Sequence, residues 1–213
     1  MREPKKLPWN EEYKVDVPEG QVGEWSIKHV TVGQEDEDRG RMFACNPSSM
    51  GRFVGSGVYT MLYHNRELWM SDTSDEIRDH LAPIHEAERS GGNVLINGLG
   101  IGVVTDAIAS MKNVTKVTVI ENSPEVIELV GPTLLKKHGD KLDIIEADSY
   151  EFKPPKGERY TVVWHDIWLY LCTDNLDEMA KLHRKYGRRA DWQGSWGKEA
   201  LQYQRRQERN SGW

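Results

Sequence analysis

Short apolar runs alternate with helix-like segments in the middle of the chain. Four such runs occupy residues 94–96, 117–120, 142–145 and 160–164, and they consist mainly of Val, Ile, Leu and Trp. Runs of this length are typical of strands that are buried on both faces of a parallel sheet. Residues 93–187 therefore predict a β-α-β-α-β order, then a connecting segment, and then a final β-α pair.

The chain before this region has the pattern of a small antiparallel unit. Residues 24–32 alternate polar and apolar side chains and are rich in β-branched residues, which predicts a strand. Residues 34–41 are mostly charged and carry a glycine near their end, which indicates a turn. Residues 58–68 predict a hairpin with a polar turn. Several capping residues then start a predicted helix over 71–90, which a Gly-Gly pair ends.

These patterns divide the chain into four parts, which are an irregular arm (1–20), a small β unit (21–70), a Rossmann-like domain (71–187) and a basic, tryptophan-rich tail (188–213). Within the tail, residues 195–209 predict a last helix, and no closing pair of strands is expected. The predicted fold class is α/β. It comprises a Rossmann-like parallel sheet flanked by helices and shortened at its C-terminal strands, with a small N-terminal β-hairpin unit.

Composition mainly excludes several classes of protein. The chain has 213 residues, and no segment approaches 18 consecutive apolar residues or has the pattern of a secretion signal. We therefore expect a soluble, cytoplasmic protein without a membrane partner. The two cysteines, Cys45 and Cys172, make neither a disulfide framework nor a metal-binding motif, so no metal site is expected.

Charge is distributed unevenly along the chain. The formal net charge is −6, but residues 181–209 carry +6 and the remainder carries −12. The overall acidity disfavours a protein that coats nucleic acid through bulk charge. The basic segment is interpreted as a solvated helix face, with contact to an anionic substrate, a nucleic acid or an acidic neighbouring subunit as the alternative.

A glycine-rich loop follows the first apolar run. The sequence Asn97-Gly98-Leu99-Gly100-Ile101-Gly102 lies between a predicted strand and a predicted helix, where a missing Cβ lets a ligand approach the backbone. Glu121 ends the next predicted strand, 23 positions after Gly98, where a carboxylate can accept hydrogen bonds from both hydroxyls of a ribose. This combination predicts a nucleoside cofactor. An ordinary strand-to-helix turn with a surface glutamate is the alternative.

The order of these features resembles the class I S-adenosylmethionine-dependent methyltransferases. The Gly-x-Gly-x-Gly spacing is similar to motif I of that family, and Asp148 follows the third run at the adenine-contacting position. The resemblance covers residues 93–170 and implies S-adenosylmethionine as the cofactor. The residues that we expect to bind the cofactor are Asn97, Gly98, Gly100, Gly102, Glu121, Asn122, Asp148 and Ser149.

Asp166, at the end of the fourth run, is the preferred catalytic candidate. A side chain at the carboxyl end of a strand beside the glycine loop faces the cleft of this fold. Methyl transfer needs in-line positioning of the acceptor and sometimes a base. His165 is the second candidate, although strand alternation predicts that it points to the other side. His80 and His85 are interpreted as solvated or helix-packing residues.

The chain also departs from the family pattern. It has Asn97 where the family usually carries an acid. The hairpin and helix before the glycine loop are similar to the layout of spermidine synthases, which implies decarboxylated S-adenosylmethionine as an alternative cofactor. The acid that spermidine synthases carry within the glycine loop, and their Asp-Ser-x-Asp-Pro-like strand end, are both missing from this sequence.

Three functions remain open at this point. The leading hypothesis is an S-adenosylmethionine-binding transferase that methylates an unidentified small-molecule or macromolecular acceptor. The second is a spermidine synthase-like aminopropyltransferase or another nucleoside-donor enzyme. The third is a methyltransferase-like module without catalytic activity that binds or assembles with a partner. An open edge of a shortened sheet needs a helix or a second subunit to cover it, so a homo-oligomer is also considered.

Half of the eight tryptophans lie between residues 164 and 196, at positions 164, 168, 192 and 196. We interpret them as buried area that anchors the C-terminal tail. A platform for a planar or cationic substrate is the alternative.

Overall fold

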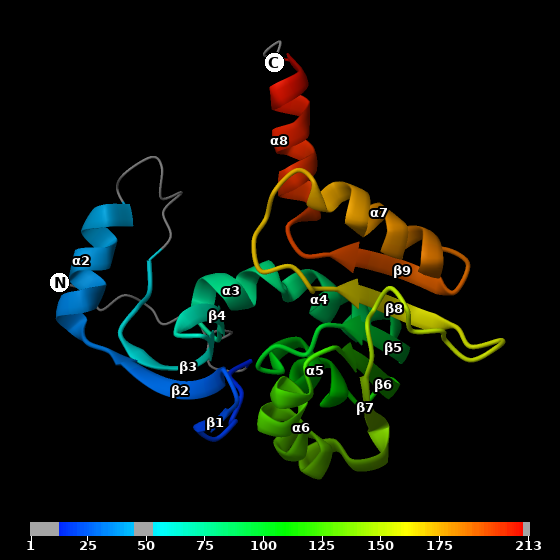
Figure 1. Ribbon diagram of the computed structural model, residues 1–213, viewed down its shortest axis with the longest axis horizontal. Coiled ribbons are helices and arrows are strands. Elements are labelled where there is room, and N and C mark those ends of the chain that lie inside the picture. The colour runs from blue at the N-terminus through cyan, green and yellow to red at the C-terminus, as the bar shows by residue number, and fades with distance from the viewer. Residues whose placement is uncertain (1–12, 45–52, 211–213) are drawn as a thin grey trace.

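The protein contains an antiparallel sheet built from the first part of the chain and a parallel sheet built from the rest. The computed structural model describes residues 13–44 and 53–210. The antiparallel sheet consists, in spatial order, of β1 (Gly20–Val22), β2 (Trp25–Val32), β3 (Gly57–His64) and β4 (Glu67–Ser71). The parallel sheet consists, in spatial order, of β7 (Leu142–Glu146), β6 (Val114–Glu121), β5 (Gly92–Asn97), β8 (Tyr160–His165) and β9 (Ala190–Ser195). Figure 1 shows the first sheet on the left and the second on the right. The predicted fold class is confirmed.

The β3–β4 hairpin and the strand before it follow the sequence prediction. The turn of the hairpin is Asn65-Arg66, whose φ angles of 50° and 69° are left-handed. Two residues in this conformation form the tight turn that matches the twist of antiparallel strands. β2 pairs with β3 along its whole length, from Trp25 opposite His64 to Val32 opposite Gly57. Local turn chemistry and alternation were therefore sufficient to predict this part of the fold.

The segment after β2 is a helix, and the predicted turn there is wrong. α2 (Gln34–Ala44) carries three acids in its first turn, where they interact favourably with the helix dipole. Arg39 forms an ion pair with Asp36, and Arg41 forms one with Glu37. These pairs at i,i+3 and i,i+4 support the helix although it has little apolar surface to bury. Hydrophobic periodicity could not reveal a helix of this kind.

The helix predicted over 71–90 is divided at His80. α3 (Ser74–Asp79) ends there and α4 (Leu81–Ser90) begins immediately after it. His80 itself has φ −103° and ψ 4°, which interrupts the helical path. Its side chain is 4% exposed. The break allows this side chain to leave the face that helical periodicity would assign to it.

The alternation of strands and helices predicted for the central region is confirmed. The helices are α5 (Val103–Ala109), α6 (Pro124–His138) and α7 (Asn175–Tyr186), and a short 3-10 turn, η2 (Gly139–Lys141), precedes β7. Ser123 caps α6 because its Oγ accepts a hydrogen bond from Val126 N at 3.3 Å. Pro124 occupies the first helical position, where its missing N–H has no cost.

Helices cover both faces of the parallel sheet. On one face, Val94 and Ile96 of β5 belong to the large core that α4, α5 and α6 complete. On the other face, Leu95 packs in a second cluster with Leu182 and Tyr186 of α7. Successive residues of β5 therefore enter two different cores, which explains why the whole run is apolar.

β9 is the strand that the sequence did not predict. It pairs in parallel with β8, and a separate helix, α8 (Lys198–Asn210), follows it. The helix predicted from residue 195 therefore begins only at Lys198. The β9 sequence, Ala-Asp-Trp-Gln-Gly-Ser, has no β-branched residue and no clear alternation. Its stability comes from the ladder with β8 and from Trp192, whose ring stacks on Trp164 at 6.4 Å.

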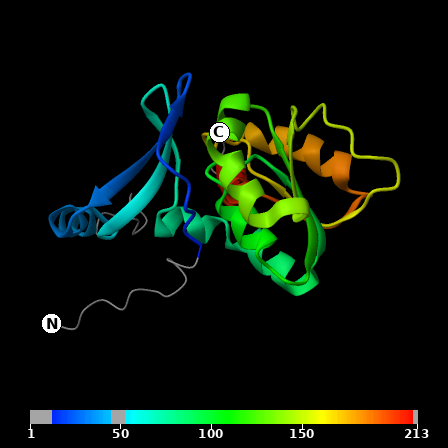
Figure 2. The same ribbon diagram turned by 90° about the horizontal axis from the view of Figure 1, so that it is seen from below.

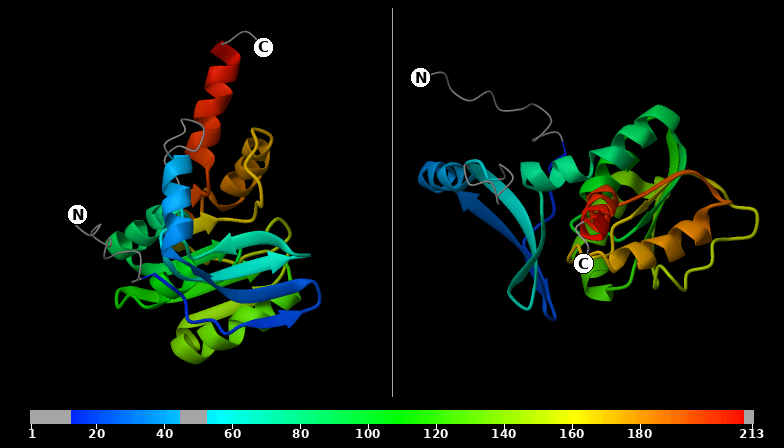
Figure 3. Two further views of the ribbon diagram at one scale, coloured as in Figure 1. Left: turned by 90° about the vertical axis from the view of Figure 1, so that its left-hand side faces the viewer. Right: turned by 90° about the horizontal axis from the view of Figure 1, so that it is seen from above.

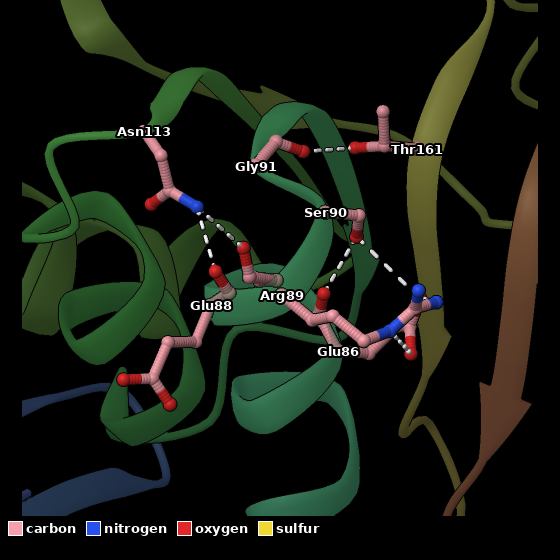
Figure 4. A network of polar contacts seen from close by, with 8 residues as sticks. Glu86, Glu88, Arg89, Ser90, Gly91, Asn113 and Thr161 are labelled. Atoms are coloured by element: carbon pink, nitrogen blue, oxygen red, sulfur yellow. Dashed lines mark hydrogen bonds and ion pairs between the residues drawn. The ribbon is translucent and has the colours of Figure 1, made fainter.

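The junction between α4 and β5 is held by side chains from two other segments. Asn113 Nδ2 donates to the carbonyl oxygen of Glu88 at 2.8 Å, and Thr161 Oγ1 donates to the carbonyl oxygen of Gly91 (Figure 4). Gly91 has φ +59°, and a Cβ on it would lie 2.5 Å from the carbonyl oxygen of Asn113. The junction therefore fixes where β5 begins and, through β5, where the glycine loop lies.

The first described residues connect the two sheets. Val15 and Val17 are 5% and 0% exposed, and they share a core cluster with Ile27 of β2 and Ile84 of α4. Residues 1–12 of the predicted arm lie outside the described residues. Figures 2 and 3 show the antiparallel sheet beside the α/β part, with α3 and α4 running from one to the other. Among the described helices, none is long and apolar enough to cross a membrane.

Candidate functional site

A cavity of about 800 Å³ lies between the carboxyl ends of the parallel strands and the antiparallel sheet. Gly98, Glu121 and Asp166 line it from the ends of β5, β6 and β8. Trp25 of β2 and Met70 of β4 line it from the opposite side. Open α/β sheets bind ligands at this edge, and the volume lies within the usual range for small-molecule sites.

The first two glycines of the loop form the floor of the cavity. Gly98 and Gly100 have φ angles of 99° and 52°, which side chains rarely adopt. A Cβ on Gly98 would lie 2.0 Å from the carbonyl oxygen of Asp166, so only glycine lets the ends of β5 and β8 meet. A Cβ on Gly100 would lie 2.3 Å from Sδ of Met70. At both positions the space that a Cβ would occupy is already filled, so the glycines let the loop pack closely against the end of β8 and against Met70.

Gly102, which we expected to bind the cofactor, does not line the cavity. It has φ 87° and immediately precedes α5. A Cβ there would lie 2.6 Å from Cδ1 of Leu134 in α6. The third glycine of the motif therefore serves the packing of α5 against α6.

Glu121 lines the cavity and also holds the glycine loop in place. Its Oε2 accepts a hydrogen bond from Leu99 N at 2.8 Å, and its Oε1 accepts from the backbone N–H groups of Asn122 and Ser123, each at 2.9 Å. An ionised carboxylate has about four acceptor positions. Three are occupied by the protein itself, which leaves about one for a ligand hydroxyl rather than the two that we expected.

The remaining residues expected at the adenine and ribose positions also line the cavity. These are Asn122, Asp148 and Ser149. Asp148 Oδ1 accepts a hydrogen bond from Tyr150 N at 2.6 Å, which fixes the turn after β7. Lys185 Nζ of α7 donates to the carbonyl oxygen of Ser149 at 2.8 Å. The structure thus brings the ends of three consecutive strands together around one space.

Asp166 forms a hydrogen-bonded ion pair with His80 in the wall of the cavity. Asp166 Oδ2 lies 2.6 Å from His80 Nε2, and both residues line the cavity. His80 Nδ1 lies 2.6 Å from the backbone carbonyl oxygen of Glu76, so both ring nitrogens are positioned to donate. Trp164 supports the imidazole from the side, with ring centroids 6.3 Å apart. A ring that donates from both nitrogens is in its protonated form.

Electrostatics agree with a protonated His80. Burial disfavours the charged imidazole, but the charge and hydrogen bond of Asp166 outweigh it and raise the pKa of His80 to about 9. Glu76 lies on the same side of the cavity, and burial raises the pKa of its carboxyl group. The sequence interpretation of His80 as a solvated or helix-packing residue missed this pair, which joins residues 86 positions apart.

His165 and Asn97 lie behind the sheet rather than in the cavity. Asn97 Nδ2 donates to His165 Nδ1 at 2.8 Å, and both side chains are fully buried. Tyr186 of α7 packs on His165, with ring centroids 5.5 Å apart. Burial lowers the pKa of His165 to about 3, so the ring is neutral. The structure therefore separates these two expected site residues from the cavity, and strand alternation explains the direction of His165.

Acidic and aromatic side chains dominate the cavity wall. The carboxylates are Glu76, Asp79, Glu121, Glu125, Asp148, Asp166 and Glu178, and the tryptophans are Trp25, Trp69, Trp168 and Trp196. Trp25 and Trp69 pack edge to face with their centroids 5.0 Å apart. Carboxylates and indole faces both favour cationic ligands. None of the four residues Glu76, Asp79, Trp25 and Trp69 carried a recognisable signal in the sequence.

The chain after β8 crosses the cavity toward the antiparallel sheet. Tyr170 Oη donates a hydrogen bond to Glu67 of β4, and Trp168 Nε1 donates to Glu178 of α7 at 2.7 Å. Trp192 and Trp196 pack on the main core. Trp192 and Trp196 thus agree with the interpretation of these tryptophans as buried area. Trp168 and Trp196 also line the cavity, where they are placed to contact a substrate.

Comparison with known proteins gives partial structural matches. No protein-family model matches the chain, and a search of curated proteins finds no significant match. A protein of Pyrococcus horikoshii proposed to be an RNA methyltransferase aligns over 56% of this chain and 57% of its own, at 16% identity and a TM-score of 0.44. The CcbJ methyltransferase of Streptomyces caelestis aligns over 53% and 44%, at 19% identity and a TM-score of 0.43. The 23S rRNA methyltransferase ErmE aligns over 52% and 42%, at 18% identity and a TM-score of 0.40.

The aligned region spans only about half the length of each of these structures. The strand order of this chain, with parallel strands and a cavity at their carboxyl ends, defines the class as a Rossmann-like α/β domain.

Proposed function

We propose that this protein is an S-adenosylmethionine-dependent methyltransferase that acts on an amine or a similar nitrogen nucleophile. The observation that carries the proposal is the position of the Asp166–His80 pair beside Gly98, at the carboxyl end of β8. A carboxylate held there faces the space in which a cofactor on the glycine loop would present its reactive group. Adenosine-type ligands of Rossmann-like folds bind beside a glycine loop in this position.

The residues that line the cavity fit this cofactor in shape and in charge. Gly98 and Gly100 line the cavity, and Glu121 keeps an acceptor position for a ribose hydroxyl. The carboxylates of the wall suit the positive charges of the sulfonium and ammonium groups. Asn97 does not contribute, since its amide is bound to His165 on the other side of the sheet. When bound, S-adenosylmethionine supplies an electrophilic methyl group on a positively charged sulfur.

Asp166 and His80 have separate tasks in this proposal. His80 remains protonated near neutral pH and holds Asp166 through Oδ2, which leaves Oδ1 to accept a hydrogen bond from an acceptor N–H. That hydrogen bond orients the nitrogen lone pair toward the methyl group, which is the main requirement of the transfer. The nitrogen loses one proton as it gains the methyl group, and Asp166 is the carboxylate that receives it.

The cavity wall favours a cationic or amine acceptor. Trp25 and Trp69 stand opposite the glycine loop, and Glu125 lies beside them in the lining. Cations bind well between aromatic faces and carboxylates. Aminopropyl transfer is the second candidate function, because an amine would occupy the same wall. The two candidates differ in the donor, so they can be separated by supplying each donor with the same panel of amines.

Isothermal titration calorimetry with S-adenosylmethionine and S-adenosylhomocysteine tests the cofactor. We expect both to bind with micromolar affinity, and we expect Gly100→Asp to abolish binding because the new side chain would displace Met70 in the wall of the cavity. Gly157→Asp is the matched control. Gly157 also has a left-handed φ, of 85°, but its Cβ would meet nothing within 4 Å. If neither ligand binds the wild-type protein at several hundred micromolar, the proposal is wrong.

A second experiment tests the reaction. The protein is incubated with methyl-tritiated S-adenosylmethionine and a panel of aliphatic and aromatic amines, and the labelled products are counted. We expect transfer to at least one amine and its loss in Asp166→Asn with cofactor binding retained. Transfer of an aminopropyl group from decarboxylated S-adenosylmethionine, without any methyl transfer, would favour the second candidate.

A further inference from the structure

A second cavity, of about 680 Å³, lies between α7 and α8. Its lining contains five basic side chains and one carboxylate, which are Arg184, Lys198, Arg205, Arg206, Arg209 and Asp177. We call this cavity the α7–α8 groove. α8 extends away from the body of the protein in Figures 1 and 3. Its charge is opposite to that of the acidic cavity described above.

Three of these five cations have no hydrogen-bond or ion-pair partner among the described residues. Arg205 donates to the carbonyl oxygen of Thr173 and lies 3.4 Å from Asp177 Oδ1. Arg184, Arg206 and Arg209 form no hydrogen bond or ion pair within residues 13–44 and 53–210, and the first of these belongs to α7. Unpaired guanidinium groups that converge on one groove repel one another. Such an arrangement is stabilised when an anion enters.

The inner end of the groove is also short of negative charge. Lys198 Nζ lies 3.1 Å from His183 Nδ1, and His183 Nε2 lies 2.9 Å from Ser195 Oγ. Burial lowers the pKa of Lys198, and burial together with the charge of Lys198 lowers the pKa of His183 to about 4. The ammonium group is therefore bound to a neutral imidazole and not to a carboxylate. The charge of Glu199 acts on this ammonium group, but Lys198 forms no ion pair among the described residues.

The spacing of the cations suits a linear polyanion. Lys198, Arg205, Arg206 and Arg209 occupy positions i, i+7, i+8 and i+11 of α8, which lie on one side of a helix. At 1.5 Å per residue this stripe is about 16 Å long. One nucleic-acid strand advances about 3.4 Å per phosphate, so the stripe matches about five phosphates. Arg184 of α7 faces the same groove from the other side.

We propose that the α7–α8 groove is a binding site for the phosphate backbone of a nucleic acid. The guanidinium groups would contact phosphate oxygens as paired donors, which is the geometry that arginine provides and lysine does not. The site is separate from the cofactor cavity but adjacent to it. Trp196 and Glu178 line the acidic cavity, while Lys198 and Asp177 line the groove. The proposal does not depend on methyl transfer, because it concerns binding alone.

Fluorescence anisotropy with the full chain tests the proposal. The probes are fluorescein-labelled 20-nucleotide single-stranded DNA and RNA of mixed sequence, and the corresponding duplexes, each titrated between 50 and 200 mM salt. For single strands, the slope of log affinity against log salt is about −0.7 per phosphate contact, so five contacts give about −3.5. The double variant Arg206→Gln, Arg209→Gln should weaken binding at least about tenfold at 50 mM salt and reduce the slope by about 1.4.

The matched control removes two positive charges elsewhere on the surface. Lys112 and Lys136 are exposed and lie before β6 and in α6, remote from α8. The variant Lys112→Gln, Lys136→Gln has the same net charge as the groove variant and should bind within about twofold of wild type, since it leaves the groove intact. Thermal unfolding and S-adenosylhomocysteine binding check that both variants remain folded.

Three outcomes would overturn the proposal. The wild-type protein could fail to bind any of the oligonucleotides at 50 mM salt. The groove variant could bind them as well as the control variant does. Polyglutamate of the same total charge could displace the probe as effectively as unlabelled oligonucleotide, which would identify the groove as a contact for an acidic protein segment. Selective loss of binding in the groove variant, together with resistance to polyglutamate, supports a nucleic-acid site.

Discussion

His80 Nε2 and Asp166 Oδ2 lie 2.6 Å apart although 86 residues separate them in the chain. The contact joins the break between α3 and α4 to the end of β8. It therefore fixes helices α3 and α4 to the parallel sheet at the edge of the cavity. It also keeps the buried imidazole of His80 protonated, because the carboxylate of Asp166 offsets the cost of burying its charge.

We expect His80 to titrate with a pKa of about 9 and the substitution Asp166→Asn to lower this pKa, while the carbonyl and the carboxylate of Glu76 continue to raise it. The substitution removes the attractive charge, while burial, which disfavours the protonated ring, remains. Nitrogen-detected NMR of the imidazole resonances measures both values. His85 is exposed and is the internal control, because its titration should not change. A His80 pKa that is the same in wild type and variant would show that the pair does not form in solution.

Substitution of Gly98 and of Gly100 by alanine should reduce the free energy of unfolding for two different reasons. Gly98→Ala places a Cβ 2.0 Å from a backbone oxygen that cannot move independently, whereas Gly100→Ala meets the side chain of Met70. Gly157→Ala meets nothing, so it measures the cost of the left-handed φ alone, about 1–2 kcal/mol. We expect Gly98→Ala to exceed that cost clearly in urea unfolding. We expect Met70→Ala to relieve part of the cost of Gly100→Ala and none of the cost of Gly98→Ala.

Equal effects of Met70→Ala in both glycine backgrounds would contradict the geometry. Additivity is the expected result only when two side chains do not touch. Gly98→Ala combined with Met70→Ala is the reference for this double-mutant cycle, because a Cβ on Gly98 would not meet Met70.

Much of the fold could be predicted because the relevant signals are local. Apolar runs identified four of the five parallel strands, and Ser123-Pro124 identified the start of α6. β9 escaped detection because its stability comes from the ladder with β8 and from the Trp164–Trp192 stack. α2 escaped because ion pairs along its surface replace an apolar face.

The site could be predicted only as far as the strand ends define it. Glu121, Asp148 and Asp166 follow strands, so the topology of an α/β sheet brings them together. His80 lies in a helical pattern, and its role depends on a contact that no local spacing reveals. Asn97 is the converse case. It belongs to the glycine motif, but its side chain enters the core on the opposite face and binds His165.

The buried His165 should make the protein sensitive to mild acid. Burial holds its pKa at about 3, whereas an unfolded histidine titrates near 6.5. Below pH 6.5 the unfolded chain takes up a proton that the folded protein excludes, so stability falls by about 1.4 kcal/mol per pH unit from this residue. His183, with a pKa of about 4, acts in the same direction. His80 has a raised pKa, so it is protonated in both states below pH 6.5 and adds no slope there.

Urea unfolding at pH 7, 6 and 5 measures this dependence. We expect His165→Gln to flatten the decline by about one proton, because glutamine does not titrate and can still accept from Asn97. His85→Gln removes an exposed histidine and should leave the decline unchanged. If the free energy of unfolding declines equally steeply with falling pH in His165→Gln and in wild type, groups other than His165 control the stability in acid.

Glu121 should be required both for the glycine loop and for cofactor binding. Its carboxylate accepts three backbone N–H groups, from Leu99, Asn122 and Ser123. In Glu121→Gln one oxygen becomes an NH₂ group, which must face at least one of those donors. An unsatisfied buried donor costs about 1–3 kcal/mol, so we expect a loss of that size in urea unfolding.

Binding of S-adenosylhomocysteine should weaken at least about tenfold in Glu121→Gln, which corresponds to the loss of about 1.4 kcal/mol. Glu125→Gln is the matched control, because Glu125 also lines the cavity but accepts no hydrogen bond from the glycine loop among the described residues. Retained affinity in Glu121→Gln, with reduced stability, would confine the carboxylate to a structural role and place the ribose elsewhere in the cavity.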